Sequence, residues 1–205
     1  FDRLKLFGDQ NWRSDLGLKG KFIVSYIGLL GIAQGVGIAV EAAEHLQHIP
    51  DIHFLIVGEG VEKEELMERA QKLQLTNITF LPRQLRKKIP SIFAASDVAL
   101  VPLVNSDLKD AVPSKLLEAW AYKKAVILAA AGEAADLLKT SGGGLLIKPG
   151  DWKGLAEGII SISKDQFFLN QCGENGFKFV LEQYNRRDTA KKMESILEQI
   201  ITENK

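Results

Sequence analysis

The chain has 205 residues, of which 46% are hydrophobic and 25% are charged, a balance typical of a globular protein with a substantial core. Its 26 basic and 26 acidic residues cancel, so the composition favours neither nucleic acid nor a cationic partner. Cys172 is the only cysteine, which excludes an internal disulfide and is typical of a reducing compartment. No apolar run approaches the ~20 residues needed to cross a bilayer, and the first residues lack a signal-peptide pattern.

The first 20 residues are mostly polar, and we expect them to form a linker from an N-terminal domain that is missing here. Beyond them, short apolar runs alternate with segments of helical periodicity. The predicted strands are 22–27, 52–57, 77–81, 98–103, 125–129 and 144–147. The predicted helices between them are 33–46, 61–75, 89–95, 114–122 and 133–139.

This alternation predicts an α/β fold: a Rossmann-like parallel sheet of about six strands, with helices on both faces and a C-terminal helical tail. We assign residues 21–165 to the sheet domain and residues 166–205 to helices that pack on it or cross to the missing domain. One face of the tail is apolar, at Met193, Ile196, Leu197, Ile200 and Ile201. Ligands of such sheets bind beyond the carboxyl ends of the strands. The segments of interest are therefore 28–37, 58–60, 81–86 and 104–118.

The strongest functional signal is the segment from Asp110 to Glu118, directly before a predicted helix. Pro113 suits a helix start because it lacks an N–H group, and Ser114 can cap the helix. The unpaired amides of the first turn and the helix dipole form an anion site. Lys115 opposes that dipole unless an anion joins it, and Glu118 could accept hydrogen bonds from a ribose diol. The spacing alone fits equally well two solvent-facing residues on a capped helix.

A dinucleotide site is the main alternative for the glycine-rich segments. Gly35 and Gly37 stand two residues apart, and Glu59 at the end of the second strand could play the ribose-binding acid of an NAD site. The turn after the first strand is long, however, and lacks Gly-x-Gly-x-x-Gly. The pattern therefore disfavours an NAD-binding dehydrogenase domain.

Two further clusters have simple interpretations. Three histidines whose spacing fits no zinc site are expected to be surface or helix-end residues; they are His45, His48 and His53. A basic run after the third strand is typical of a solvated helix face, with a diphosphate or an anionic membrane surface as alternative partners. It consists of Arg83, Arg86, Lys87 and Lys88.

An ordered set of motifs resembles the donor-binding domain of the retaining glycosyltransferases of the GT4 family. The motifs are 26–35, 56–60, 77–82, 96–103, 112–119, 124–127, 132–135 and 147–151. Members of that family have the GT-B fold, in which two Rossmann-like domains face each other across a cleft. The resemblance is greatest to bacterial enzymes that build cell-surface polysaccharide from UDP-N-acetylamino sugars.

By this resemblance, Glu118 binds the ribose hydroxyls, Asp110 replaces a glutamate that contacts the donor sugar, and Lys115 stabilises the departing diphosphate. The other residues assigned to the donor site are Gly28, Gly31, Gly58, Glu59, Leu81, Pro82, Pro113, Ser114, Leu116 and Leu117. Leu29 and Gln34 stand where many members have arginine and lysine. Two diphosphate cations are therefore missing, and more of their work falls on Lys115 and on backbone amides.

The resemblance implies a hexosyltransferase that moves a sugar from a UDP-linked donor to an acceptor hydroxyl, without a metal ion or other cofactor. The implied partners are the nucleotide-sugar, the missing N-terminal acceptor domain, and a lipid-linked or saccharide acceptor at the membrane surface, but no nucleic acid. The expected location is the cytoplasm, including the inner face of the membrane. This chain alone is expected to be inactive. A sugar-nucleotide epimerase of GT-B type and a non-catalytic nucleotide-sugar-binding module remain alternatives.

Overall fold

A computed structural model describes residues 12–184 and 186–203. Within them, six strands form one sheet in which every pair of neighbours is parallel. The strands are β1 (Phe22–Ile27), β2 (Ile52–Val57), β3 (Ile78–Leu81), β4 (Val98–Pro102), β5 (Ala125–Ala129) and β6 (Gly144–Ile147). Their order is β3-β2-β1-β4-β5-β6. The chain adds β2 and β3 on one side of β1 and then returns to add β4, β5 and β6 on its other side, so the strand order reverses between β1 and β4. The predicted parallel sheet is confirmed.

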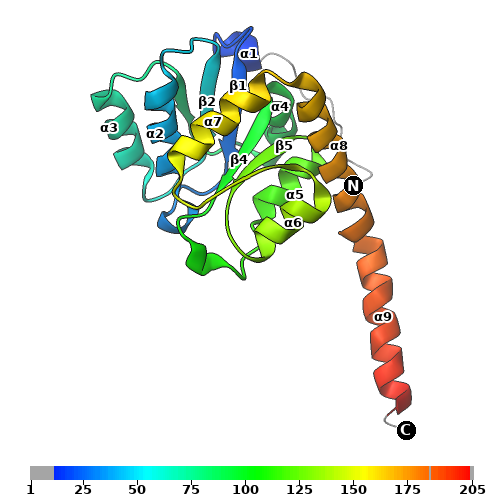
Figure 1. Ribbon diagram of the computed structural model, residues 1–205. Helices are drawn as coiled ribbons and strands as arrows, with labels where there is room; N and C mark the ends of the chain where they lie inside the picture. The colour runs from blue at the N-terminus through cyan, green and yellow to red at the C-terminus, as the bar shows by residue number, and fades with distance from the viewer. Residues whose placement is uncertain (1–11, 185, 204–205) are drawn as a thin grey trace.

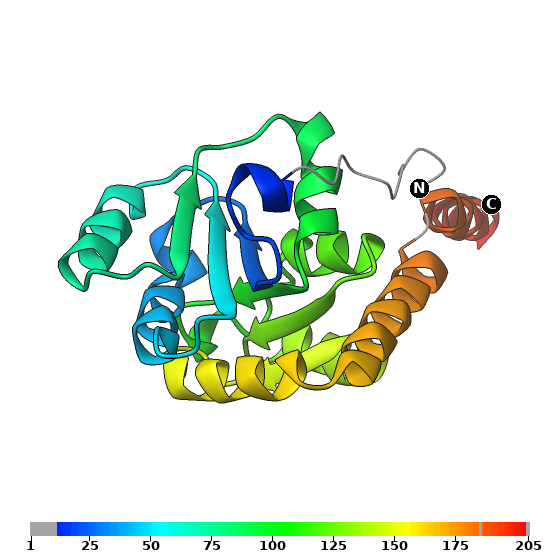
Figure 2. The same ribbon diagram turned by 90° about the horizontal axis from the view of Figure 1, so that it is seen from above.

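Helices cover both faces of this sheet (Figures 1 and 2). The α-helices are α1 (Trp12–Asp15), α2 (Gly37–Leu46), α3 (Lys63–Lys72), α4 (Ile89–Ala95), α5 (Ser114–Ala121), α6 (Glu133–Ser141), α7 (Trp152–Ser163), α8 (Gln166–Gln183) and α9 (Arg186–Glu203). Three short 3-10 helices are η1 (Ile32–Gln34), η2 (Arg86–Lys88) and η3 (Ser106–Leu108). One core lies under α2, α3 and α7, and another lies under α4, α5 and α6.

The strands form because their side chains are apolar on both faces. In β1, Val24 and Tyr26 point into the core beneath α2, and Ile23 points into the opposite core. This alternation follows from the two-residue period of a strand. β2, β4 and β5 are buried along their full length. Because α5 packs its fully buried Trp120 against this sheet, the start of α5 is held at the sheet's carboxyl edge.

The helix predicted over 33–46 begins later, at Gly37. The chain first makes the 3-10 turn η1, and Gly35 then adopts a left-handed conformation with φ of 60°. That conformation ends η1 and interrupts the helix, because a left-handed residue cannot continue a right-handed helix. The prediction missed that the two glycines stand outside or at the very start of α2, and a long loop over 28–36 therefore follows β1.

The segment before β1 packs on the sheet domain from residue 12 onward; residues 1–11 of the expected linker lie outside the described chain. Helix α1 lies beside α4, and the Trp12 indole donates a hydrogen bond to Ser91 over 2.8 Å. Arg13 pairs with Asp97 over 2.6 Å, and the Asp97 carboxylate also accepts from the amide of Ile23. The division into linker, sheet domain and tail stays a prediction.

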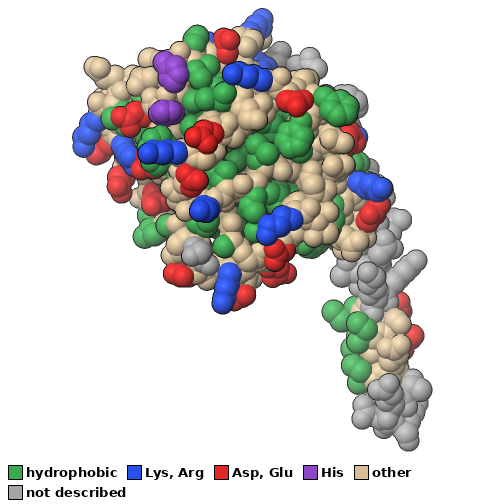
Figure 3. Space-filling model, in the orientation of Figure 1, with side chains coloured by type: hydrophobic (Ala, Val, Ile, Leu, Met, Phe, Trp, Pro, Cys, Tyr) green, Lys and Arg blue, Asp and Glu red, His purple; other side chains and the backbone are tan. Residues whose placement is uncertain are grey.

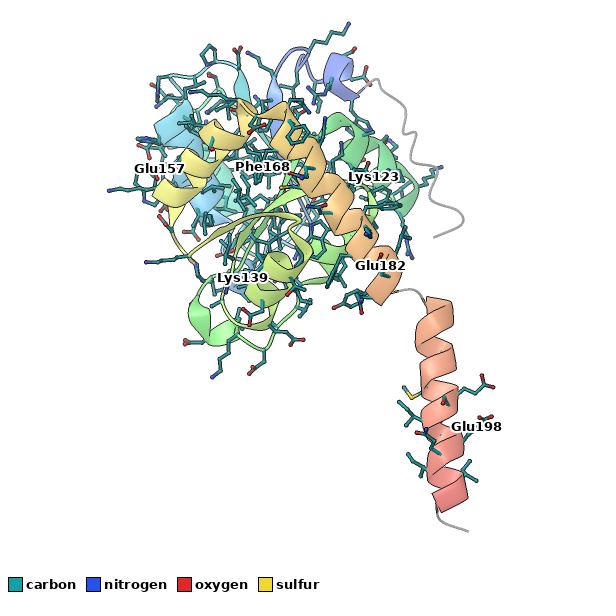
Figure 4. The ribbon with its side chains drawn as sticks, turned by 45° about the vertical axis from the view of Figure 1, so that its right-hand side comes forward. Lys123, Lys139, Glu157, Phe168, Glu182 and Glu198 are labelled. Atoms are coloured by element: carbon teal, nitrogen blue, oxygen red, sulfur yellow. The ribbon has the colours of Figure 1, made fainter. Side chains whose placement is uncertain are left out.

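The tail is helical, as expected, but its helices differ in exposure. Helix α8 packs along α5, and Lys123 pairs with Glu174 of α8 over 2.8 Å (Figure 4). Cys172, among polar neighbours in the sequence, is a core residue of α8, and burial raises the pKa of its thiol to about 11. Helix α9 projects away from the domain (Figure 1). Its apolar stripe is exposed, with Met193 at 57% and Ile201 at 60% (Figure 3).

Over the described residues, the helices are either too short or too polar to cross a bilayer.

Candidate functional site

The loops at the carboxyl edge of the sheet meet where the strand order reverses, between β1 and β4. In open parallel sheets this switch point leaves a crevice for a ligand, because the two flanking connections leave in opposite directions. Here the loop after β1 contributes Gly28 and Gln34, and the loop after β4 leads into α5 with Lys115. The two loops are joined by a hydrogen bond from the amide of Val104 to the carbonyl of Ala33 over 3.2 Å.

Lys115 extends from the first turn of α5 across the end of β1. A Cβ atom on Gly28 would lie 2.1 Å from Cε of Lys115, so the lysine chain occupies the space that this glycine leaves open. The ammonium lies 5.5 Å from the centroid of the Tyr26 ring and donates a hydrogen bond to the carboxamide oxygen of Gln34. Burial lowers the pKa of Lys115, and Glu118 partly opposes that effect.

The start of α5 differs from the predicted cap. Pro113, not Ser114, is the N-cap residue, and no side chain caps this helix. Because Ser114 is already the first helical residue, its hydroxyl is not placed to accept from the first-turn amides. The Leu116 amide donates to the Pro113 carbonyl over 3.0 Å, whereas the amides of Ser114 and Lys115 make no backbone hydrogen bond in the described chain. An uncapped end of this kind can bind an anion.

Glu118 lies one turn after Lys115, on the same side of α5. The residue as a whole is exposed, but surrounding atoms remove part of the water from its carboxyl group, and this burial raises its pKa; the charges of Arg86 and Lys115 oppose that rise. Arg86 belongs to η2, after β3, so a cation from a different strand connection faces this carboxylate. Tyr122 directly follows α5, and burial raises its pKa, with the charge of Arg86 opposing that rise. Its ring stacks on Phe93 with ring centroids 4.8 Å apart.

The loops that follow β1 and β2 contact each other through their main chains. A Cβ atom on Gly58 would lie 1.8 Å from the carbonyl oxygen of Gly28, and one on Gly60 would lie 2.1 Å from that of Leu30. Backbone hydrogen bonds join the same loops, including Leu30 to Glu59 over 2.8 Å. The two glycines after β2 are therefore required for the loops after β1 and β2 to touch. Gly31, in contrast, has only the Leu29 side chain near its Cβ position, at 3.6 Å.

Glu59, Leu81 and Pro82 lie along the ends of β2 and β3. The Glu59 carboxylate pairs with Lys63 over 2.7 Å and accepts from the Arg83 amide over 3.3 Å. These bonds, led by the one to Lys63, lower its pKa. The carbonyl of Leu81 accepts from Gly58 over 3.1 Å, and that of Pro82 accepts from the Gln84 side chain. Glu59 thus links the loop after β2 to the loop after β3 through one of its carboxylate oxygens, and its assignment to the donor site stays a prediction.

Asp110 lies apart from Lys115 and Glu118. It is exposed and lines a hollow of about 350 Å³ whose other walls come mostly from α6 and the residue before it, including Gly132 and Glu133. The Glu133 amide donates to the Lys109 carbonyl over 2.7 Å, which fixes this loop against the start of α6. Neither Lys115 nor Glu118 lines this hollow. The structure therefore places Lys115 and Glu118 on one side of α5, whereas Asp110 lines a separate hollow against α6.

Sequence reasoning missed three side chains of this region. Gln34 was noted only as a missing cation, and its contact with Lys115 joins residues 81 positions apart, which no local pattern reveals. Tyr26 was treated as a strand residue, although its ring lies beneath the ammonium. Arg86 belongs to the basic run interpreted as a solvated helix face, with a diphosphate or a membrane surface as alternatives, and the effect of its charge on Glu118 was not predicted. A basic residue just after a strand is the one signal that could have pointed to the site.

No group of three or more histidine, cysteine, aspartate or glutamate residues in the described ranges could hold a metal ion. His45 and His48 are exposed at the end of α2. His53, expected at the surface or a helix end, is instead buried in β2 and bonded to Thr79 over 2.8 Å. Burial, with the charge of Lys21, lowers its pKa to about 4. His53 is covered because both faces of this parallel sheet carry helices.

A six-stranded parallel sheet of this order, with a lysine and an uncapped helix at its switch point, defines a Rossmann-like α/β domain. The chain belongs to the glycosyl transferases group 1 family, whose sequence pattern matches residues 8–179. The family resemblance predicted from the motifs is therefore confirmed.

Curated relatives agree with this assignment. WcaI of Escherichia coli K12, a glycosyl transferase assigned to colanic acid biosynthesis, is 34% identical over 142 residues, which are 68% of this chain and 35% of that protein. The UDP-Gal:alpha-D-GlcNAc-diphosphoundecaprenol alpha-1,3-galactosyltransferase of Escherichia coli is 28% identical over 178 residues, 83% of this chain and 44% of that protein. The chain thus spans less than half of the length of these relatives.

Solved structures share the fold. HepE of Anabaena in complex with UDP has a TM-score of 0.83 at 21% identity, covering 96% of this chain and 55% of that one. The C-terminal domain of LpcC, a glycosyl transferase group 1 protein of Francisella tularensis, has a TM-score of 0.74 at 23% identity. That likeness covers 89% of this chain and 98% of the solved domain, so the described fold corresponds to a unit that has been crystallised without the rest of its protein.

Proposed function

We propose that this chain is the donor-binding half of a retaining glycosyltransferase that uses a UDP-linked sugar in cell-surface polysaccharide synthesis. The observation that carries the proposal is the position of the Lys115 ammonium over the end of β1, beside the uncapped start of α5. A diphosphate seated there meets a full positive charge, two open amides and the helix dipole. A lysine at a helix N-terminus is unfavourable because its charge opposes the helix dipole, and the bound anion offsets this repulsion.

Transfer from a nucleotide-sugar leaves a nucleoside diphosphate that carries the negative charge of the broken bond. Fixed donors aimed at that charge accelerate the reaction because they need no rearrangement as it develops. Lys115 and the amides of Ser114 and Lys115 fill this role. Glu118, one turn further along α5, accepts hydrogen bonds from the ribose hydroxyls.

The rest of the donor lies along the carboxyl edge. The base borders the main chain at Leu81 and Pro82, the diphosphate passes over Gly28 and Gly31, and the donor sugar lies toward Asp110. The amides of Leu116 and Leu117 were also assigned to the diphosphate; the bond from Leu116 to Pro113 leaves Ser114 and Lys115 better placed. No metal ion takes part, since ammonium and amide groups neutralise the leaving group.

The acceptor is a lipid-linked or saccharide hydroxyl held by an N-terminal domain outside this chain. We place the reaction in the cytoplasm, at the inner face of the membrane. Support comes from the names of the relatives, one of which acts on a diphosphoundecaprenol-linked sugar. Because the proposal assigns the acceptor to that other domain, this chain on its own is expected to bind the nucleotide but to transfer no sugar.

Calorimetric titration of the chain with UDP, GDP, ADP and NAD tests this proposal. UDP is expected to bind, and Lys115→Ala and Glu118→Ala are each expected to weaken it without loss of folding. Binding of NAD in preference to UDP would instead support a dehydrogenase domain. UDP binding that is unchanged in both variants would remove the proposal. An intact full-length protein that binds UDP-sugar but never turns it over would identify a non-catalytic module.

A further inference from the structure

Gln34 is held rigidly at the carboxyl edge of the sheet. It is the last residue of η1, and its amide donates to the Gly31 carbonyl over 2.9 Å. The next residue, Gly35, is left-handed, and a Cβ atom there would lie 2.8 Å from Cα of Val104. The turn is thus pressed against the loop after β4. Gln34 therefore presents its side chain from a fixed backbone.

The carboxamide oxygen of Gln34 accepts a hydrogen bond from the Lys115 ammonium. The Tyr26 ring, which is completely buried, lies on another side of the same ammonium at 5.5 Å. Gly28 leaves the path open for the lysine chain between them. Gln34, Tyr26 and Gly28, all from β1 or the loop after it, thus surround the Lys115 side chain and fix the position of its ammonium group.

A neutral partner suits this position. Burial lowers the pKa of Lys115 because it removes water from the ammonium, and an oxygen that accepts from the ammonium replaces part of that water. No carboxylate in the described ranges forms an ion pair with Lys115. A carboxylate in place of the carboxamide would cancel the charge that a diphosphate needs. A carboxamide fixes the ammonium and leaves its charge intact.

We propose that Gln34 is a positioning residue, whose carboxamide oxygen holds the Lys115 ammonium over the carboxyl end of β1 so that it meets the donor diphosphate. This inference rests on the proposed function for its ligand, but the contact itself can be tested without one. It also explains how the chain manages without a second cation at position 34. The second positive charge is replaced by better placement of the first.

The ligand-free test measures the titration of Lys115. Its pKa is obtained from the pH dependence of acetylation by acetic anhydride, followed by peptide mass spectrometry. Gln34→Met keeps the length of the side chain but cannot accept, so the pKa of Lys115 is expected to fall. Gln34→Glu adds a carboxylate, so the pKa is expected to rise. Gln47→Met, an exposed position at the end of α2, is the matched control and should change nothing.

Apart from the carboxylate that Gln34→Glu adds, the neighbouring titratable groups are the same in all four proteins. Glu118 of α5 raises the pKa of Lys115. Tyr26 has its own pKa raised, first by burial and then by Glu62, so it stays neutral over the range studied. Gln34 itself does not titrate. A change confined to the two Gln34 variants is therefore assigned to the lost or altered acceptor.

The second test measures UDP affinity as a function of pH. Binding needs the ammonium form, so affinity is lost as the pH rises through the pKa of Lys115. In Gln34→Met this loss is expected at lower pH than in the wild type, with affinity at neutral pH weaker by about two- to tenfold, the value of one hydrogen bond. Gln34→Glu should also bind more weakly at neutral pH, although its loss comes at higher pH, because the added carboxylate repels the diphosphate.

The outcomes separate the two proposals. If the wild type binds UDP, but Gln34→Met titrates Lys115 as the wild type does and binds UDP within twofold of it, the positioning role is wrong and the donor site stands. If the wild type does not bind UDP but the pKa of Lys115 moves as expected, the positioning contact stands and the proposed function is wrong. Thermal unfolding of each variant verifies folding, and Gln34→Asn, which keeps the acceptor but falls one methylene short, replaces Gln34→Met if that variant unfolds.

Discussion

The Lys115 side chain fills the space that a side chain at Gly28 would need, since a Cβ atom on the glycine would lie 2.1 Å from Cε of the lysine. Gly28→Ala is therefore expected to push the lysine out of position and to weaken UDP binding about tenfold, which corresponds to ~1.4 kcal/mol. Gly37→Ala is the control, because a Cβ there meets nothing within 4 Å. Calorimetry on both variants provides the comparison, and equal affinities would show that the lysine position does not matter.

Lys115→Met is expected to separate binding from stability. The ammonium contributes a charged hydrogen bond to the ligand, so its loss should weaken UDP binding by about 10- to 100-fold. The folded domain loses little, because a lysine at a helix N-terminus opposes the dipole by roughly 0.3–1 kcal/mol. Thermal unfolding should thus shift by no more than about 2–4 °C. A large drop in Tm together with the lost affinity would mean that the lysine holds the fold.

Glu118→Gln is expected to change how UDP binding depends on pH. Burial raises the pKa of Glu118, and the ionised form is the better acceptor for ribose hydroxyls. As the pH falls through this pKa, the wild type loses that advantage, so its affinity should approach that of Glu118→Gln. Well above it, the variant should bind about tenfold more weakly. Pyrophosphate, which has no ribose, is the control ligand; an equal loss of its affinity would contradict the assigned role.

Asp97→Ala is expected to loosen α1 from the sheet domain. The carboxylate accepts from Arg13 and from the Ile23 amide, both over 2.6 Å, and its loss leaves two donors unpaired. The free energy of unfolding should fall by about 1–3 kcal/mol, with UDP affinity unchanged because the contact is at the opposite end of β1. Chemical denaturation measures the first quantity and calorimetry the second. Unchanged stability would show that residues 12–20 contribute little to the domain.

Removal of residues 185–205 tests the role of α9. The apolar stripe on this helix is exposed, with Leu197 at 53% and Ile196 at 51%, so its packing adds little to the domain. The shortened chain should unfold within about 2 °C of the full chain, since 1 kcal/mol shifts the Tm of a domain this size by about 2–4 °C. Val180→Asp, which places a charge in the core, is the contrasting variant and should lower Tm strongly. A large effect of the truncation would show that α9 packs on the domain in solution.

The sheet could be predicted because it follows from short-range patterns. The run 125–129 is apolar throughout and 52–57 is apolar apart from His53, and only a strand covered on both faces buries every side chain of such a run. The boundaries of α2 could not be predicted in the same way. Gly35 ends η1 in a left-handed conformation and leaves no room for a Cβ atom against Val104, and that contact depends on a loop almost 70 positions further along the chain.

The site was predictable where one helix carries it and not where several loops meet. Lys115 and Glu118 stand on α5, so their shared side follows from helical spacing. Asp110 precedes that helix, and the loop turns it toward α6, which spacing cannot show. The partner of Lys115 comes from the loop after β1, 81 positions away in the chain. That contact and the burial of His53 depend on tertiary structure, whereas the ion pair of Glu59 with Lys63 joins residues only four positions apart.

The loops after β1 and β2 contact each other through their backbones at Gly58 and Gly60, and this contact has a consequence for how the fold evolves. Where carbonyls and glycines form the contact, side chains that stand clear of it can vary without moving the two loops. Leu29, exposed in the loop after β1, is such a position. A lineage can diversify its chemistry in this way, and shapes that superpose closely then coexist with sequences that share only about a fifth of their residues.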